Sequence, residues 1–342
     1  MEYRLLGASG MAVSRLCLGT MTFGESTDET AAHEQLDAFR SAGGTFIDTA
    51  DVYNAGVSEQ IVGRWLADRS GAHDEMVVAT KGRFPTGAHP NAVGLSRRHL
   101  HEALDSSLER LGVDVIDLYQ VHSWDPLTPV EETLRFMDDA IRAGKVHYFG
   151  LSNFTGWQVA AVVERARAAG LMAPVSLQPQ YNLLTRLIEV EVVPASQEYG
   201  LGLMPWGPLA GGWLTGKYQR EERPSGDTRL GDDPDRGMEA YDRRNTDRTW
   251  AVLDVVAEVA EEAELTMAQV ALAWLADKPA VTAPILGART VEQLEASLDV
   301  ADLHLDVAHM ERLDEISAPD LPDYPYGEMG VEQRGRSVSH GR

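Results

Sequence analysis

The sequence has one cysteine, Cys17, among 342 residues, no long apolar run and few basic residues. A single cysteine excludes an internal disulfide and a cysteine-based zinc site, and it is typical of a reducing compartment. No apolar run approaches the ~20 residues that cross a membrane, and the first residues do not resemble a signal peptide. We therefore expect a cytoplasmic protein with no bound metal and no membrane contact.

Positive charge is scarce, since 30 Lys and Arg residues stand against 53 Asp and Glu residues, a formal net charge of −23. A field of this sign repels nucleic acid and anionic membrane surfaces, so neither is expected as a partner. The expected partner is a small-molecule substrate. Any anion that binds needs a local cluster of cations.

The sequence also lacks the usual dinucleotide motif, because no Gly-x-Gly-x-x-Gly follows a predicted strand. This absence argues against a Rossmann fold. Residues 211–217 match most of a P-loop, but Tyr218 stands where that motif needs a Ser or Thr for magnesium. The sequence therefore also argues against ATP or GTP binding.

Short apolar runs alternate with helical periodicity along the chain. The runs that predict strands are 16–19, 45–47, 76–79, 115–121, 146–151, 175–177, 201–204 and 281–286. Stripes such as Leu100, Leu104, Leu108 and Leu111 predict helices that pack on these strands. The alternation favours an α/β fold, a single eightfold (β/α)8 TIM barrel, and the alternative is a doubly wound sheet.

The length also fits one barrel. We predict a single domain over residues 1–342, with an N-terminal β-hairpin at 3–15, the barrel at 16–316 and a polar C-terminal tail at 317–342. Residues 216–245, a long loop after the seventh strand, are rich in Gly, Pro, Asp and Arg and lack apolar periodicity. Such a segment is usually functional or disordered, and we expect a lid.

Polar side chains stand where three predicted strands end: Asp48, Lys81 and His122, with Tyr53 five residues after Asp48. An Asp and a Tyr near one strand end would by themselves predict a helix cap and a half-buried aromatic. Three strand ends are different, because the carboxyl ends of barrel strands share one face. The sequence therefore predicts that these four side chains meet in one site.

The four residues suit carbonyl chemistry. A phenol with a pKa near ~10 is a poor acid at neutral pH, so a catalytic Tyr53 needs its phenolate stabilised. An ammonium on Lys81 that lowers the pKa by ~2 units would supply ~2.7 kcal/mol. Asp48 would keep Lys81 charged, and His122 would donate a hydrogen bond to a carbonyl oxygen. Such a proton donor reduces a carbonyl once a cofactor supplies hydride.

With these residues, the sequence from about Tyr3 to Ile316 resembles the aldo-keto reductases, in the branch of potassium-channel β subunits and bacterial aldo/keto reductases. The resemblance rests on Gly19-Thr20-Met21, Asp48-Thr49-Ala50-Asp51-Val52-Tyr53, Thr80-Lys81, Gln120-Val121-His122, Gly150-Leu151-Ser152-Asn153 and Gly287-Ala288-Arg289. It implies reversible, NADPH-dependent reduction of an aldehyde or ketone. Tyr53 would be the general acid, Lys81 and Asp48 its tuning pair, and His122 the residue that orients the carbonyl.

The resemblance also implies the NADPH site. Polar groups at strand ends would hold the nicotinamide, a glycine-rich loop with nearby cations would clamp the pyrophosphate, and Arg289 at a helix start would bind the 2′-phosphate. The expected cofactor contacts are Gly19, Thr20, Met21, Asp48, Ser152, Asn153, Gln178, Trp206, Gly207, Pro208, Leu209, Gly211, Lys217, Arg229, Gly287, Arg289, Gln293 and Ser297. Ala296 and Ser297 replace the acidic and amide residues that relatives often have for the adenine, so we expect a greater dependence on Arg289.

Aromatic side chains are expected to line the substrate pocket and indicate a bulky or apolar carbonyl compound. The expected lining is Phe23, Tyr53, Phe84, Trp124 and Trp206. Two alternatives stay open. One is an NADPH-binding regulatory module with little turnover, like the potassium-channel β subunits. The other is a barrel lyase or isomerase in which Lys81 forms a Schiff base.

Overall fold

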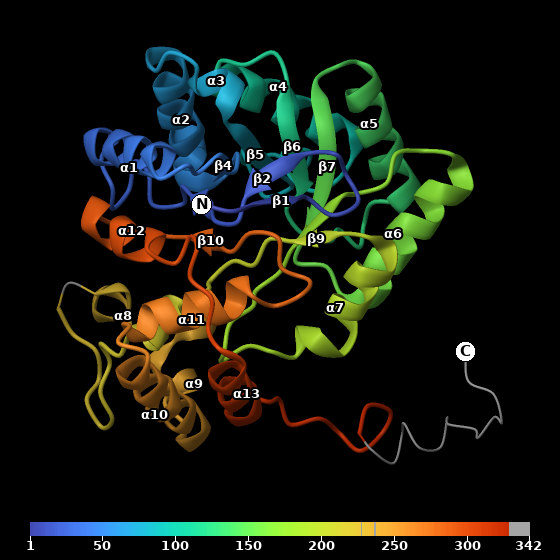
Figure 1. The fold of residues 1–342 in the computed structure, drawn as a ribbon. Coiled ribbons are helices and arrows are strands. Elements are labelled where there is room, and N and C mark those ends of the chain that lie inside the picture. The colour runs from blue at the N-terminus through green and yellow to red at the C-terminus, as the bar shows by residue number, and fades with distance from the viewer. Residues whose placement is uncertain (227, 236, 328–342) are drawn as a thin grey trace.

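The computed structural model describes residues 1–226, 228–235 and 237–327 (Figure 1). Within them, eight parallel strands form one sheet in the order β10-β3-β4-β5-β6-β7-β8-β9. The strands are β3 (Cys17–Gly19), β4 (Phe46–Asp48), β5 (Val77–Gly82), β6 (Ile116–Val121), β7 (Val146–Ser152), β8 (Ser176–Gln178), β9 (Gly202–Leu203) and β10 (Ile285–Leu286). Each strand overlaps one of the eight predicted runs.

The two edges of this sheet meet. The amide of Thr282 donates to the Leu203 carbonyl at 2.8 Å, and the amide of Ile285 donates to the Pro205 carbonyl at 2.8 Å. On its other side, Ile285 pairs with Cys17 of β3. The predicted (β/α)8 barrel is therefore confirmed, and the doubly wound sheet is excluded.

A hairpin of β1 (Tyr3–Leu5) and β2 (Ala12–Ser14) precedes the barrel, as predicted. Leu6 and Val13 are fully buried and pack with residues of the barrel interior, including Cys17, Phe46 and Leu118. The hairpin therefore closes the end of the barrel opposite the carboxyl ends of the strands, and a site can open only at the other end.

The outer helices are α1 (Glu29–Ser41), α2 (Val57–Asp68), α3 (Ala72–Glu75), α4 (Arg97–Leu111), α5 (Val130–Arg142), α6 (Gly156–Ala169), α7 (Ile188–Tyr199), α10 (Asp247–Glu262), α11 (Met267–Ala276), α12 (Val291–Leu298) and α13 (Val307–Ile316). Helix α4 shows why they form. Ser96 caps its first turn, Leu100 and Leu104 bury one face, and Gly112 ends it with a φ of 66°. In the part of the chain that the structure describes, no helix is long and apolar enough to span a membrane.

The segment after β9 corrects one expectation. Residues 216–245 contain α8 (Arg229–Asp232), η3 (Gly237–Glu239) and α9 (Tyr241–Arg244). Tyr241 stacks on Trp213 at 5.6 Å, and Arg244 Nε donates to Glu239 at 2.7 Å. The expectation of a structureless loop is wrong for this part, because isolated anchors such as Tyr241 hold it without producing apolar periodicity.

The tail leaves α13 along the outside of the barrel (Figure 1). Arg248 Nη2 donates to the carbonyls of Ser317 and Ala318 at 3.0 and 2.8 Å. Farther on, the Tyr326 hydroxyl donates to Glu191 of α7. Residues 328–342 of the predicted tail lie outside the described residues, and the assignment of residues 1–342 to a single domain stays a prediction.

Candidate active site

Parallel pairing brings the predicted residues to one end of the barrel. Asp48 is the last residue of β4, and Lys81 is the last but one of β5, where it lies opposite Gln120 of β6. Tyr53 begins a short turn, η1 (Tyr53–Gly56), and His122 directly follows β6. The four candidate catalytic residues therefore come from three neighbouring strand ends.

Lys81 is the centre of the site. Its fully buried ammonium donates to Asp48 Oδ2 at 2.7 Å, to the Thr49 carbonyl at 2.8 Å and to the Tyr53 hydroxyl at 3.1 Å. Burial by itself lowers the pKa of Lys81, but Asp48 and Tyr53 together outweigh it and raise that pKa well above its usual value. Lys81 is therefore a cation in contact with the phenol oxygen.

The half-buried Tyr53 differs from the expectation in its acidity. Burial raises the pKa of Tyr53, and this effect is larger than the opposing effect of the Lys81 ammonium, while Asp48 also raises it. The prediction that Lys81 produces a net lowering of the Tyr53 pKa is wrong, because burial of the phenol outweighs the effect of the ammonium and Asp48 adds to the increase. Tyr53 is protonated at neutral pH and can donate a proton.

His122 lies beside Tyr53, with the two rings edge to face at 5.9 Å. Burial lowers the pKa of His122 to about 2, and the charges of Lys81 and Arg83 act in the same direction. The imidazole is therefore neutral at physiological pH. A neutral imidazole donates from one nitrogen, so His122 can polarise a carbonyl without bringing a second cation beside Lys81.

Asp48 is held by two amides. Gln120 Nε2 donates to Asp48 Oδ1 at 3.0 Å, and Gln178 Nε2 donates to the same oxygen at 2.9 Å. No role of Gln120 was predicted from the sequence. The sequence did contain a sign of this role. Residues two apart on a strand share a face, and Gln120 lies two residues before His122. Because the amide nitrogen of Gln178 donates to Asp48, its Oε1 atom is the one left for the expected contact with the cofactor.

Three of the expected nicotinamide contacts are linked by hydrogen bonds. Asn153 Nδ2 donates to Ser152 Oγ at 3.0 Å and to the His122 carbonyl at 3.1 Å. Trp206 Nε1 donates to Asn153 Oδ1 at 3.0 Å. The half-buried Trp206 indole is thus fixed next to the catalytic residues, and its orientation does not depend on a ligand.

The loop after β9 has two glycines whose backbone conformation disfavours a side chain. Gly207 and Gly211 have φ angles of 65° and 66°, a region that favours glycine. Pro208 between them is buried, and Leu209 is half-buried. No side chain on Gly207 or Gly211 stands between the loop backbone and a bound group.

Lys217 follows this loop and lies near two arginines. Its side chain reaches solvent, yet protein atoms crowd the ammonium. This partial burial lowers the pKa of Lys217, and the nearby charges of Arg289 and Arg229 lower it further. Three cations gathered in a protein with a net charge of −23 make a site for an anion.

Other expected cofactor contacts lie around α12 and β3. Gln293 Oε1 accepts from the Arg289 amide at 3.0 Å, and the Ser297 hydroxyl donates to the Gln293 carbonyl at 2.9 Å. Gly287 is exposed beside them. Near β4, Gly19 pairs with Asp48, the Thr20 hydroxyl donates to the Asp48 carbonyl at 3.2 Å, and Met21 is partly exposed.

An open groove of about 560 Å³ lies between α1 and α12, with Arg289 on its wall. Its other charged lining residues are Glu34, Asp37, Glu292 and Glu295. These carboxylates repel a phosphate. A phosphate bound by Arg289 is therefore expected on the side that faces Lys217.

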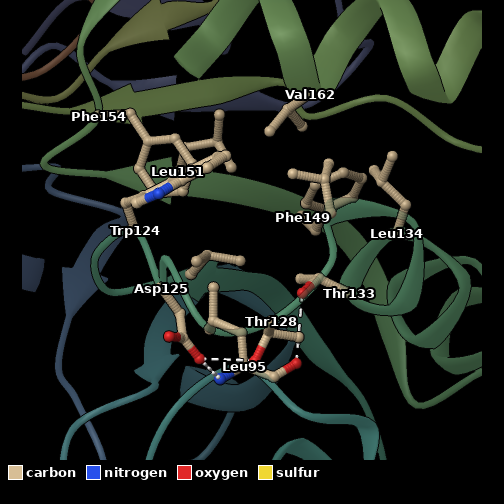
Figure 2. A pocket seen from close by; sticks show the side chains of 12 residues that line it. Leu95, Trp124, Asp125, Thr128, Thr133, Leu134, Phe149, Leu151, Phe154 and Val162 are labelled. Carbon is tan, nitrogen blue, oxygen red and sulfur yellow. Dashed lines mark hydrogen bonds between the residues drawn. The ribbon is translucent and has the colours of Figure 1, made fainter.

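The aromatic residues expected to line the substrate pocket do not all lie in the same surroundings. Phe84 packs edge to face on His122 at 4.6 Å, and Trp124 packs on Phe154 and Trp157 at 5.5 and 5.3 Å. Trp124 and Phe154 also cover an apolar cavity of about 20 Å³ between the sheet and α5 and α6 (Figure 2). Assigning Phe23 to the pocket is wrong, because its side chain is fully buried in the core.

In the described parts of the chain, no group of three or more His, Cys, Asp or Glu side chains could hold a metal ion. Cys17 is buried, and burial raises the pKa of its thiol.

Comparison with known proteins gives a consistent result. The model of the Aldo/keto reductase family matches residues 15–318. A Bacillus subtilis protein named uncharacterized oxidoreductase YrpG is 38% identical over 92% of this chain and 96% of its own length. A probable voltage-gated potassium channel subunit beta of rice is 37% identical over 93% of this chain and 96% of its own. Versiconal hemiacetal acetate reductase of Aspergillus parasiticus is 32% identical over 93% and 98%. The chain belongs to the aldo/keto reductase family, a family of nicotinamide-dependent oxidoreductases.

Proposed function

We propose that the protein reduces an aldehyde or ketone to an alcohol with NADPH, reversibly, and that Tyr53 is the general acid. The observation that carries this proposal is the chain of hydrogen bonds that joins Asp48, Lys81 and the Tyr53 hydroxyl, with the neutral His122 ring beside it. A protonated phenol, a cation and a neutral hydrogen-bond donor around one point are what a carbonyl oxygen needs as it becomes an alcohol.

Each residue has a separate task in this reaction. His122 donates a hydrogen bond that holds the carbonyl oxygen, and the Tyr53 hydroxyl delivers the proton to that oxygen. Lys81 stabilises the phenolate that Tyr53 becomes, and Asp48 keeps Lys81 charged and directed at it. A bound nicotinamide supplies the hydride. In the reverse direction, the phenolate of Tyr53 accepts the proton of the alcohol.

The state of Lys81 argues against the Schiff-base alternative. An amine attacks a carbonyl only when it is unprotonated. The Lys81 ammonium donates three hydrogen bonds, and its pKa is raised. A lyase or isomerase that begins with Lys81 as nucleophile is therefore disfavoured.

The test is the consumption of NADPH by the pure protein with a panel of aldehydes, ketones and sugars, followed at 340 nm with the alcohol product identified. We expect turnover with at least one class of carbonyl compound. Tight NADPH binding with negligible turnover across the panel would instead favour the regulatory module, and the rice relative is named a probable voltage-gated potassium channel subunit beta.

The choice of NADPH over NADH rests on the cluster of three cations formed by Lys217, Arg229 and Arg289. If Arg289 binds the 2′-phosphate, Arg289→Ala removes a charge-assisted contact. NADPH affinity should then weaken by roughly ten- to a hundredfold while NADH affinity hardly changes. Calorimetry with both cofactors measures this. Arg98→Ala, on the exposed side of α4, is a matched control for the loss of one positive charge. Equal losses for both cofactors, or a wild type that prefers NADH, would contradict the assignment.

A further inference from the structure

Arg83 takes no direct part in the reaction proposed above, although it lies next to the site and its charge helps to lower the pKa of His122. The residue follows β5 two positions after Lys81, and its carbonyl accepts from the Gly94 amide at 2.9 Å. Its guanidinium carbon lies over the Phe84 ring, 4.9 Å from the ring centre. The same Phe84 ring contacts His122 at 4.6 Å. One aromatic ring thus contacts both the arginine and the residue proposed to hold the carbonyl.

The hydrogen-bonding capacity of Arg83 is largely unused. A guanidinium has five N–H donors. Its Nη2 donates to the Trp124 carbonyl at a long 3.5 Å, and its buried Nε has no partner among the described residues. Among the described residues, no carboxylate lies within 4 Å of Arg83. A half-buried cation with unfilled donors is costly to a fold and is expected where a ligand completes the contacts.

Asp125 is the nearby carboxylate that could have neutralised Arg83, and its charge does reduce the field of the arginine. Its oxygens are already used. They accept from the amides of Leu95 and Leu127, both at 2.9 Å, and from the Thr128 hydroxyl at 2.6 Å. Figure 2 shows this carboxylate directed at Leu95 and Thr128. Asp125 therefore holds together the two loops that bear Arg83 and Trp124. The guanidinium of Arg83 can then bind another anion.

We propose that Arg83 binds a carboxylate on the substrate, so that the preferred carbonyl compounds are oxo acids with an aromatic or apolar spacer between carbonyl and carboxylate. The inference rests on the proposed function and names its substrate class. The Phe84 ring, between His122 and Arg83, contacts the spacer. The planar fork of the guanidinium matches a carboxylate with two parallel hydrogen bonds. A protein with a net charge of −23 needs such a local cation to hold an anionic substrate.

The test compares 4-formylbenzoate with 4-formylbenzamide, which differ in charge but hardly in shape. With NADPH, the wild type should show a kcat/KM for the benzoate about ten- to a hundredfold higher. Arg83→Ala should abolish this preference and leave the benzamide value within about threefold, and Arg83→Lys should retain part of it. Added salt should reduce the wild-type preference. Arg98→Ala again controls for net charge and should retain the preference.

Two results would overturn the inference. One is a wild type that does not prefer the benzoate. The other is an equal loss for both substrates in Arg83→Ala, which would mean that Arg83 only supports Phe84. If the protein reduces neither these aldehydes nor any other compound of the panel, the proposed function fails without deciding the role of Arg83. Binding of 4-(hydroxymethyl)benzoate and its amide, followed by tryptophan fluorescence, then decides whether Arg83 discriminates charge, and equal binding of both by the wild type would refute it.

Discussion

Tyr53→Phe should keep the fold and the cofactor affinity, while turnover in carbonyl reduction falls by about 10²- to 10⁴-fold, the range for a lost general acid. The substitution removes only the hydroxyl to which Lys81 donates at 3.1 Å. The ring keeps its edge-to-face contact with His122. Single-turnover reduction of a carbonyl substrate, with cofactor binding measured separately, divides the effect between chemistry and binding. Reduction that survives within a factor of a few would exclude Tyr53 as the proton donor.

The pH dependence of the wild type separates Tyr53 from His122. The pKa of Tyr53 is raised, so its reactive phenol is present through neutral pH and is lost only as pH rises through that raised pKa. Alcohol oxidation needs the phenolate and should instead accelerate as pH rises. His122 has a pKa of about 2 and does not titrate near neutrality. A reduction rate that changes with a midpoint near ~6.5 would indicate an imidazole as the proton donor.

The sequence predicted the barrel and the meeting of the site residues because both follow from local patterns. Short apolar runs separated by helical stripes predict a parallel sheet covered by helices, as a barrel or a doubly wound sheet, and in both the strands carry their end residues to one face. Asp48, Lys81 and His122 therefore came together without any knowledge of long-range contacts. The same reasoning explains why the hairpin and the helix that begins at Val291 were found.

Other features depend on contacts that no local pattern encodes. Phe23 looks like a pocket aromatic in the sequence, but only the packing of its loop shows that it is buried. Tyr241 and Arg244 hold the segment after β9 through Trp213 and Glu239, residues that are 28 and 5 positions away. The pKa of Tyr53 depends on the balance between burial, Lys81 and Asp48. That balance is set by the packing of these groups in the fold and not by their residue types.

The buried pair of Asp48 and Lys81 carries a large expected effect on stability. Their side chains are 2% and 0% exposed, and removing one partner from such a pair leaves a buried charge, which costs about 3–5 kcal/mol. Lys81→Met should lie at the lower end of this range, because Gln120 and Gln178 still donate to Asp48. Asp48→Asn leaves the buried Lys81 ammonium without a counter-charge and with neutral acceptors only, such as the Thr49 carbonyl and the Tyr53 hydroxyl. The midpoints of urea denaturation measure both losses.

The double variant Asp48→Asn, Lys81→Met should be more stable than either single variant, because it leaves no unpaired charge in the barrel. This difference should be constant around neutral pH. The pKa of Lys81 is raised, so its stabilising contribution is complete below the unfolded pKa of ~10.4 and is lost only as pH rises through the folded value. Lys145→Met, which breaks the exposed ion pair with Asp105, is the matched control and should cost much less. Simple addition of the two single losses in the double variant would show that Asp48 and Lys81 do not act as a coupled pair, and the proposed tuning of Tyr53 would lose its basis.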